Sequence, residues 1–420
     1  MSSSRDIERN LVPRFCLYAV LRNMRFFDPF IFLFFLVDLD LAFTTIGALL
    51  AYEKMLLVVL EIPLAAILDR FGRRRGLMVG FGCAGIACLG LGYSAQTAHP
   101  LPWVVGALTL YGVGEALRTG THKAIILDWL TQRGERDRKT DVIGLTRFFS
   151  KATAGLTALV AGTLVWWTGG FAITFWLAAV PTLGVVALIA SYPVALEGSL
   201  TRTAKTRPRD GVDWRGIWRS VRRREWCLLI LPSVLFESQI KLVGYYLQPA
   251  LAEAFADLGW AVLGVGALGV GAYAGISGLL AGSASLFSAP LLRRVGDARR
   301  VLRDVHLLGA VAVCAAAVGL MTGVVWPSLV ILVGLAGLQN LRRPIFVAAF
   351  DTVMEPDYRA THLSIESQAR SAVYSLTALC TGFLADLYGL AAAFAVMASL
   401  LGLAVVSDRV ASRGSRSPAP

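Results

Sequence analysis

The chain alternates between long apolar segments and short polar ones. The apolar segments lie near residues 15–37, 43–68, 76–96, 102–130, 142–167, 171–194, 226–252, 262–292, 302–323, 327–354, 363–385 and 391–407. A helix needs about 20 apolar residues to cross the hydrocarbon core of a bilayer. Membrane β-strands would be about ten residues long and would alternate in polarity. The pattern therefore predicts an all-α membrane protein with twelve transmembrane helices.

Composition and charge agree with a membrane protein. Hydrophobic residues make up 56% and charged residues 16% of the 420 residues, whereas soluble domains have about 45–50% and 25%. The formal net charge of +12 comes from Lys and Arg gathered in alternate loops, at 70–75, 133–139 and 293–300. The loops at 37–41, 96–100 and 168–170 contain neither residue. The positive-inside rule then predicts that both termini lie in the cytoplasm. We expect the protein in the cell (inner) membrane. The expected partner of its positive charge is therefore the lipid bilayer and not nucleic acid.

The longest polar segment divides the predicted spans six and six. We expect an N-terminal six-helix bundle at 1–195, a basic cytoplasmic linker at 196–225, a C-terminal six-helix bundle at 226–410 and a disordered tail at 411–420. Residues 155–164 resemble residues 375–384, which indicates that the halves are duplicated. In the linker, Trp214, Ile217, Trp218 and Val221 follow helical spacing. An interfacial amphipathic helix and a solvated linker both fit that stripe.

One loop carries a family resemblance. Residues 65–77, AAILDRFGRRRGL, resemble the signature between the second and third spans of the major facilitator superfamily, with Ala65 in place of its first glycine. Further segments, among them 25–29 and 114–124, look like a little-characterised prokaryotic branch. The resemblance implies two pseudo-symmetric six-helix bundles, alternating access and no ATP site.

The same resemblance implies a cytoplasmic gate. In the family, the carboxylate of this loop meets a helix end and cationic groups when the cytoplasmic side is closed. We carry this role over to Asp69, Arg70, Gly72, Arg73 and Arg74, with Asp128 and Arg138 as companions. A turn-capping role for Asp69 remains the alternative.

Several charged residues fall inside the predicted spans, where each costs roughly 2.5–3.5 kcal/mol on insertion scales. They therefore predict a substrate cavity lined by Arg22, Arg25, Asp28, Glu53, Glu115, Arg118, His122, Glu237 and Lys241. Glu115, Arg118 and His122 fall on one face of a continuous helix. A static ion pair, and a structural role for His122, are the alternatives there. Arg25 either binds an anionic group of the substrate or neutralises Asp28.

These features predict a secondary active transporter of a small polar or charged solute. The chain has no phosphate-binding loop, so the energy would come from an ion gradient or from the gradient of the substrate itself. Protons are the candidate coupling ion, through Glu53, Glu115 or Glu237. The alternative is a non-transporting sensor or assembly partner of similar fold. We expect a monomer without enzymatic activity, cofactor or metal, and we interpret the six cysteines as small core residues.

Overall fold

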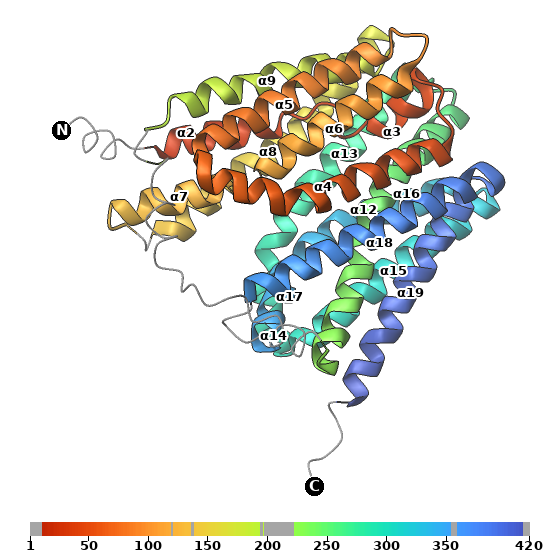
Figure 1. The fold of residues 1–420 in the computed structure, drawn as a ribbon. Helices are drawn as coiled ribbons and strands as arrows, with labels where there is room; N and C mark the ends of the chain where they lie inside the picture. Colours follow the sequence, from red (N-terminus) through yellow and green to blue (C-terminus); the bar gives the residue numbers. More distant parts are fainter. Residues whose placement is uncertain are drawn as a thin grey trace. The chain divides into compact units, whose positions relative to one another are not determined.

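A computed structural model describes residues 11–118, 121–135, 138–193, 196, 222–353 and 359–414. Within these ranges every regular element is a helix (Figure 1). Nine helices of the described chain are long and apolar enough to cross a membrane. The predicted all-α membrane fold is therefore confirmed, and the number of twelve spans stays a prediction. The predicted linker helix at 214–221 lies outside the described residues.

The chain divides into two compact units. Unit 1 comprises Met1–Leu39 and Met55–Asp210, and unit 2 comprises Asp40–Lys54 and Gly211–Pro420. These units differ from the predicted bundles because residues 40–54, the start of the second predicted span, group with unit 2. The predicted domain boundaries at 195 and 226 stay predictions.

The elements of unit 1 are α2 (Val12–Asn23), α3 (Ile31–Leu33), a π-helical turn (Phe34–Asp38), the later part of α4 (Phe43–Phe71), α5 (Arg73–Ser94), α6 (Pro100–Arg118), α7 (Thr121–Gln132), α8 (Lys139–Thr168) and α9 (Ala172–Ala190). In unit 1, α5 packs against α6 and α9, and α2 packs against α8. The first predicted span is interrupted, because α2 ends at Asn23 and helical structure resumes at Ile31. Residues 119–120, between α6 and α7, lie outside the described residues.

Unit 2 repeats much of this arrangement. After the first part of α4 it contains α12 (Arg224–Asp257), α13 (Val265–Ala284), a 3₁₀ turn (Ser285–Phe287), α14 (Ser288–Val295), α15 (Ala298–Thr322), α16 (Val325–Leu332), α17 (Leu335–Val353), α18 (Arg359–Tyr388) and α19 (Leu390–Gly414). Helix α19 thus continues into the segment predicted as tail. Arg409, near its end, favours this continuation because cations stabilise helix C-termini.

The internal repeat is visible in the packing. Helices α8 and α18, which contain the two similar segments, are each 30 residues long. In unit 1, α2 packs against α8 and α9, and α5 packs against α9. In unit 2, α12 packs against α18 and α19 in the same way, and α15 packs against α19. Equivalent helices therefore have equivalent neighbours in the two units.

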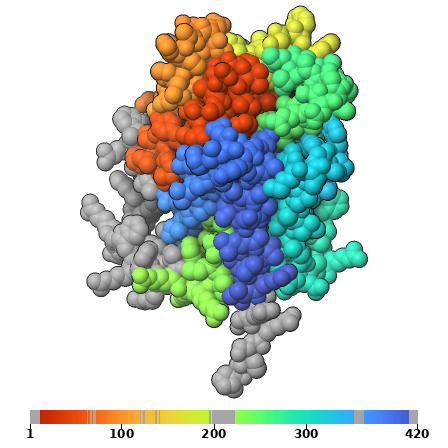
Figure 2. All heavy atoms as spheres, turned by 90° about the vertical axis from the view of Figure 1, so that its right-hand side faces the viewer, coloured from red at the N-terminus to blue at the C-terminus, as the bar shows by residue number. Residues whose placement is uncertain are grey.

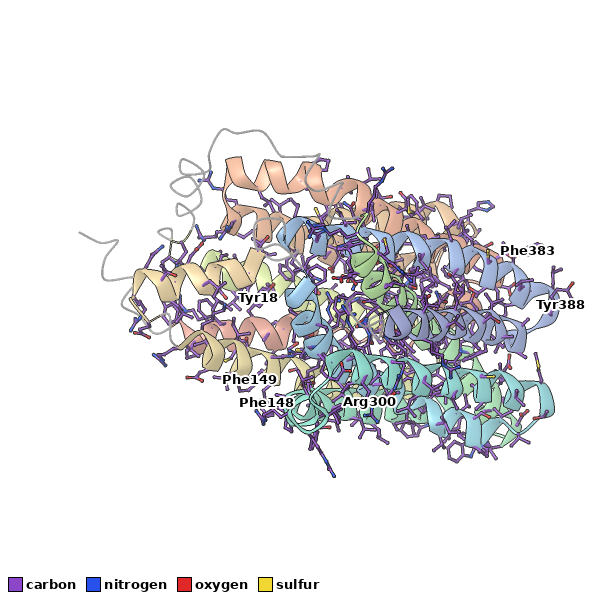
Figure 3. All side chains as sticks on the ribbon, turned by 90° about the horizontal axis from the view of Figure 1, so that it is seen from below. Tyr18, Phe148, Phe149, Arg300, Phe383 and Tyr388 are labelled. Carbon is purple, nitrogen blue, oxygen red and sulfur yellow. The ribbon has the colours of Figure 1, made fainter. Side chains whose placement is uncertain are left out.

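Large apolar side chains point away from the helices into the surroundings. Phe148 and Phe149 project from α8, and Phe383 and Tyr388 project from α18 (Figure 3). The surface of α18 and α19, blue in Figure 2, also carries exposed Leu376, Leu403 and Val406. Such continuous apolar exposure marks an interaction surface in water, and it is the normal surface of a helix that faces lipid. Three of the cysteines, Cys227, Cys314 and Cys380, are exposed too, which corrects their assignment to the core.

Helices α5 and α6 cross at two glycines. A Cβ atom on Gly114 would lie 2.5 Å from the carbonyl oxygen of Gly80. Small residues allow membrane helices to approach this closely. We expect Gly114→Val to lower the free energy of unfolding by about 1–3 kcal/mol, because neither backbone can move away freely. Gly106→Val, on the same helix with nothing within 4 Å of its added Cβ atom, is the matched control in thermal unfolding. Equal melting temperatures for the two variants would contradict the close crossing.

Two aspartates cap helices that are distant in sequence. In unit 1, Asp38 accepts hydrogen bonds from the backbone N–H groups of Phe171 and Ala172 at 2.8 and 2.9 Å, at the start of α9. In unit 2, Asp386 accepts bonds from the N–H groups of Phe43 and Thr44 at 2.9 and 2.7 Å, at the start of α4. Both carboxylates satisfy donors that a helix N-terminus leaves unpaired.

The cap on α4 has a defined pH dependence. Burial disfavours the charged form of Asp386, but the hydrogen bonds from Thr44 and Phe43 outweigh it and lower the pKa. Because the pKa of Asp386 is lowered in the folded protein, ionised Asp386 stabilises the fold at pH values above its unfolded pKa of about 3.9. This stabilisation is lost as the pH falls through the folded-state pKa. We expect Asp386→Asn to weaken the cap by about 1 kcal/mol at neutral pH. Faster hydrogen exchange at residues 43–46 would report it, with Asp304→Asn as control. Unchanged hydrogen exchange at residues 43–46 in Asp386→Asn would contradict the helix cap.

Candidate functional site

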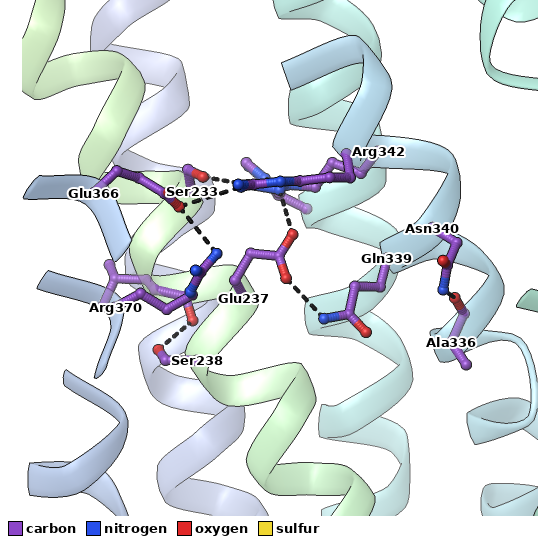
Figure 4. Close-up of polar contacts among 12 residues, drawn as sticks. Ser233, Glu237, Ser238, Ala336, Gln339, Asn340, Arg342, Glu366 and Arg370 are labelled. Carbon is purple, nitrogen blue, oxygen red and sulfur yellow. Dashed lines mark hydrogen bonds and ion pairs between the residues drawn. The ribbon is translucent and has the colours of Figure 1, made fainter. Parts of the chain in front are cut away.

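The most deeply buried polar network lies in unit 2 and is centred on Arg342 of α17 (Figure 4). The Arg342 side chain is 0% exposed. Its Nη1 donates to Glu237 Oε1 at 2.8 Å, and its Nη2 donates to the hydroxyl of Ser233. Its Nε donates to His306 Nε2 at 2.9 Å. One guanidinium therefore joins α12, α15 and α17.

The hydrogen bond from Arg342 determines which ring nitrogen of His306 carries the proton. A guanidinium only donates hydrogen bonds, so His306 Nε2 must accept and Nδ1 must carry the hydrogen. Nδ1 lies 2.6 Å from Asp408 Oδ2 on α19, which is the acceptor. His306 is thus neutral, and the hydrogen bonds run without interruption from Asp408 to Glu237.

Helix spacing and packing hold Glu237 in place. Ser233 and Glu237 lie one turn apart on α12, and Gln339 and Arg342 lie one turn apart on α17. Gln339 Nε2 donates to the second carboxylate oxygen of Glu237 at 2.7 Å. The guanidinium carbon of Arg342 lies 5.2 and 5.1 Å from the ring centres of Phe236 and Phe346. Every oxygen of the Glu237 carboxylate is therefore occupied, in surroundings that exclude water.

A second carboxylate stands between two more arginines. Glu366 of α18 is fully buried, and its Oε1 lies 3.4 Å from both Arg343 Nη1 and Arg370 Nη1. These distances are long for charge-assisted hydrogen bonds, which prefer about 2.7–2.9 Å. One carboxylate thus neutralises two guanidinium groups loosely.

Two lysines of unit 2 approach one aromatic ring. Lys54 of α4 and Lys241 of α12 place their Nζ atoms 6.0 and 5.9 Å from the ring centre of Tyr374 on α18. Lys54 also contacts Glu53 Oε1 at 2.5 Å. The sequence pairs Glu237 with Lys241 by spacing. The structure gives Glu237 the partner Arg342 instead and brings Lys241 to Tyr374.

Unit 1 holds the other predicted cavity residues. Arg25 and Asp28 form an ion pair at 2.9 Å in the turns that follow α2, and Arg118 contacts Glu115 within α6. Arg25 also lies 5.8 Å from the ring centre of Tyr111, and both Arg25 and Arg22 act electrostatically on Glu115. Five predicted residues therefore come together here: Arg22, Arg25, Asp28, Glu115 and Arg118. Their predicted ladder does not continue as a helix, because α2 ends at Asn23, before Arg25.

His122 contacts aromatic side chains of unit 1. The predicted common face of Glu115, Arg118 and His122 stays a prediction, because residues 119–120 lie outside the described residues. The imidazole stacks on Tyr18 and contacts the Tyr192 hydroxyl at 3.1 Å. Phe15 packs edge-on against it. These contacts support the structural alternative for His122.

The predicted gate residues of unit 1 make contacts close to the α4–α5 turn. Gly72 takes a positive φ of 94° between the two helices, which glycine adopts without strain. Arg73 Nη1 contacts Asp128 Oδ2 at 2.6 Å, which joins α5 to α7. Arg74 donates to the carbonyl oxygens of Ile189 and Ala190 at the end of α9. The side chains of Asp69 and Arg70 lie outside the described residues, so their gate role stays a prediction.

Arg138 pairs elsewhere than expected. It contacts Glu135 at 2.6 Å, as does Arg133 at 2.8 Å. Hydrogen bonds from Arg133 and Arg138 lower the pKa of the Glu135 carboxyl. Arg138 therefore belongs to a local cluster in the α7–α8 loop, which no sequence pattern singled out.

Sequence reasoning missed most of the unit 2 network. Arg342, His306, Asp408 and Glu366 were not among the predicted site residues, although Leu341-Arg342 resembles Leu117-Arg118 in the first half. That repeat was a usable signal, since it places an arginine at related positions of both halves. Across the described side chains, no three His, Cys, Asp or Glu residues gather closely enough to hold a metal ion.

Apolar helices that surround ion pairs and polar networks at membrane depth are the architecture of membrane transporters. The chain belongs to the Major Facilitator Superfamily, whose pattern its sequence matches over residues 15–338. It is thus a multi-pass membrane protein of a transporter family. No curated protein sequence matches the chain.

Solved structures of similar fold are transporters. Two crystal structures of the nucleoside transporter NupG superpose with TM-scores of 0.78 and 0.75 at 13% identity, cover 96% and 98% of this chain, and are themselves covered completely. A POT family transporter in complex with a thioalcohol-conjugated peptide gives 0.72 at 13% identity, with 97% of this chain and 96% of that chain covered. At these identities the likeness is one of fold.

Proposed function

We propose that this protein is a secondary active transporter of a small polar or charged solute, driven by protons through alternating access. It acts as a monomer in the cell inner membrane with both termini in the cytoplasm. The gate formed around Asp69 and the substrate contacts of Arg25 and Glu115 are parts of this proposal.

The observation that carries the proposal is the buried Glu237–Arg342 pair. Both partners lie inside apolar helices, with side-chain exposures of 8% and 0%. Taking an ion pair out of water costs more than it returns unless every group is satisfied, so such pairs are weak evidence for stability and better evidence for function.

Protonation supplies the second state of this pair. A neutral Glu237 carboxyl no longer attracts Arg342, so the link between α12 and α17 weakens and the two helices are free to move apart. Loss of the proton restores the pair. A carboxylate that binds either a proton or an arginine can thus couple proton movement to a change in helix packing.

Fold neighbours support the class of solute without choosing one. They are a nucleoside transporter and POT family transporters in complex with a peptide conjugate and with 5-aminolevulinic acid. All of the compounds named here are small polar molecules. The many charges of unit 1 and unit 2 favour a solute of the same kind.

Reconstitution tests the proposal. We expect proteoliposomes to accumulate at least one member of a panel of radiolabelled nucleosides, dipeptides, amino acids and small organic acids when the pH gradient is imposed. Dissipating that gradient with a protonophore should abolish accumulation but leave counterflow exchange. Failure of every panel member to exchange would overturn the proposal, and accumulation that persists in the presence of the protonophore would remove proton coupling.

A further inference from the structure

The turn between α14 and α15 carries a dense group of arginines. Segment 293–304 contains five arginines and two aspartates, which leaves an excess of three positive charges. Four of the arginines are exposed, namely Arg293, Arg294, Arg299 and Arg300 (Figure 3). Among the described side chains none forms an ion pair with these four, whereas the fifth, Arg303, pairs with Asp304 at 3.1 Å. The described part of the protein therefore does not balance the charge of this turn.

Helix polarity does not account for all four exposed arginines. Arg293 and Arg294 lie in the last turn of α14, where cations are favourable. Arg299 and Arg300 lie in the first turn of α15, at the positive end of its dipole, where cations are unfavourable. Asp297 accepts hydrogen bonds from the backbone N–H groups of these two arginines at 2.9 and 3.3 Å, so its carboxylate is already engaged by the helix. An anion from outside the chain would compensate the unfavourable placement.

Exposed apolar side chains continue from the arginines along both helices. Phe287 is 63% exposed and lies about two helical turns before Arg294 on the same face of α14. On α15, exposed Leu307 and Val311 lie about two and three turns after Arg300, again on the same face. Helix α14 packs against α15 across a turn of two residues, so both pairs of arginines lie at the same end of the two helices. Charge at one end and apolar exposure beyond it form one continuous surface.

We propose that this surface binds an anionic phospholipid, with its headgroup at the four exposed arginines and its acyl chains along the apolar faces of α14 and α15. A phosphodiester carries one negative charge, and its oxygens accept hydrogen bonds from guanidinium groups. Clusters of about four to eight basic residues beside a membrane span attract anionic lipids. A lipid satisfies both the charged and the apolar part of the surface, whereas a soluble anion satisfies the charged part alone. The site is separate from the proposed transport site and does not depend on transport.

Lipid binding to the purified, delipidated full-length protein tests the proposal. Phosphatidylglycerol and phosphatidylcholine with the same acyl chains differ in net charge, and glycerophosphoglycerol is the anionic headgroup without chains. Native mass spectrometry at constant ionic strength measures the dissociation constant of each. We expect phosphatidylglycerol to bind at least about tenfold more tightly than the other two. Equal affinity of the two lipids would overturn the proposal, and so would equal affinity of the headgroup alone, which would indicate a site for soluble anions.

Two double variants locate the bound headgroup. Each removes one pair of exposed arginines: Arg293→Gln with Arg294→Gln, and Arg299→Gln with Arg300→Gln. We expect each double variant to raise the dissociation constant of phosphatidylglycerol at least about tenfold and to change that of phosphatidylcholine little. Because the substituted side chains are exposed, the melting temperature without added lipid should stay at the wild-type value.

The matched control removes two exposed cations from another part of the chain. Arg138→Gln with Lys139→Gln, at the start of α8, changes the net charge by the same amount and should leave the affinity for phosphatidylglycerol unchanged. An equal loss of affinity in this control would show a general effect of net charge and overturn the site. Unchanged affinity in both arginine double variants would overturn it as well.

Phe287 tests the apolar part of the surface. We expect Phe287→Gln to raise the dissociation constants of phosphatidylglycerol and phosphatidylcholine by the same factor, about fivefold, because the two lipids share their acyl chains. The preference for phosphatidylglycerol should therefore persist in this variant. Unchanged affinity for both lipids would overturn the placement of the acyl chains along α14.

Discussion

Replacing Arg342 with Met is expected to lower the free energy of unfolding by about 3–5 kcal/mol. The substitution preserves an apolar stem but removes the only buried cation in hydrogen-bonding contact with Glu237 among the described residues. Breaking a buried pair by removing one partner leaves the other charge uncompensated, which is the origin of this magnitude. His306 and Ser233 lose a hydrogen-bond donor at the same time.

Thermal unfolding of the detergent-solubilised protein measures this loss. Arg343→Met is the matched control, since Arg343 neighbours Arg342 on α17 but is 37% exposed and makes one contact of 3.4 Å to Glu366. The double variant Arg342→Met with Glu237→Met should recover part of the stability, because it removes both charges. Equal melting temperatures for the two single arginine variants would show that the ion pair contributes little.

Glu237→Gln is expected to abolish accumulation driven by a pH gradient while counterflow exchange persists. A glutamine side chain fills the same space and cannot ionise, so it resembles the protonated carboxyl permanently. The cycle of proton uptake and release at this position is therefore removed, although the helices keep the packing that exchange requires. The initial rate of gradient-driven uptake should fall at least tenfold relative to the wild-type protein, which is a barrier change of about 1.4 kcal/mol or more.

The control for this experiment lies on the same helix. Glu253 is an exposed carboxylate near the end of α12, about four turns from Glu237. Glu253→Gln should leave both accumulation and its pH dependence as they are in the wild-type protein. If Glu237→Gln keeps the wild-type pH dependence, the proton is carried by another group, and Glu53 and Glu115 are the next residues to replace.

The predicted helices illustrate what a sequence pattern can and cannot fix. Long apolar runs predicted α5, α9, α15 and α19 because hydrophobicity summed over a span decides whether that span crosses a bilayer. The same pattern predicted one continuous span across 15–37 and missed its break between Asn23 and Ile31. A few turn residues among apolar ones hardly alter the summed hydropathy, so the apolar pattern carries no record of the break.

The candidate site divides in the same way. Glu237 and Arg118 were predicted because a charge inside an apolar run is visible in one dimension. Arg342 was not predicted as the partner of Glu237, because it lies 105 residues further along the chain. The spacing on one helix suggested Lys241 as the partner instead. His306 and Asp408, 102 residues apart, share the same limitation.

By itself the sequence determined the membrane class, the all-α fold and the family. Each of these depends on summed hydropathy or on a contiguous motif such as residues 65–77. Only the tertiary structure decided the partners of the buried charges. Those depend on how each helix is rotated and which helix packs beside it, because side chains reach only the neighbours that face them. The choice of Arg342 for Glu237, and of Tyr374 for Lys241, is therefore a property of the packed helices and not of any one of them.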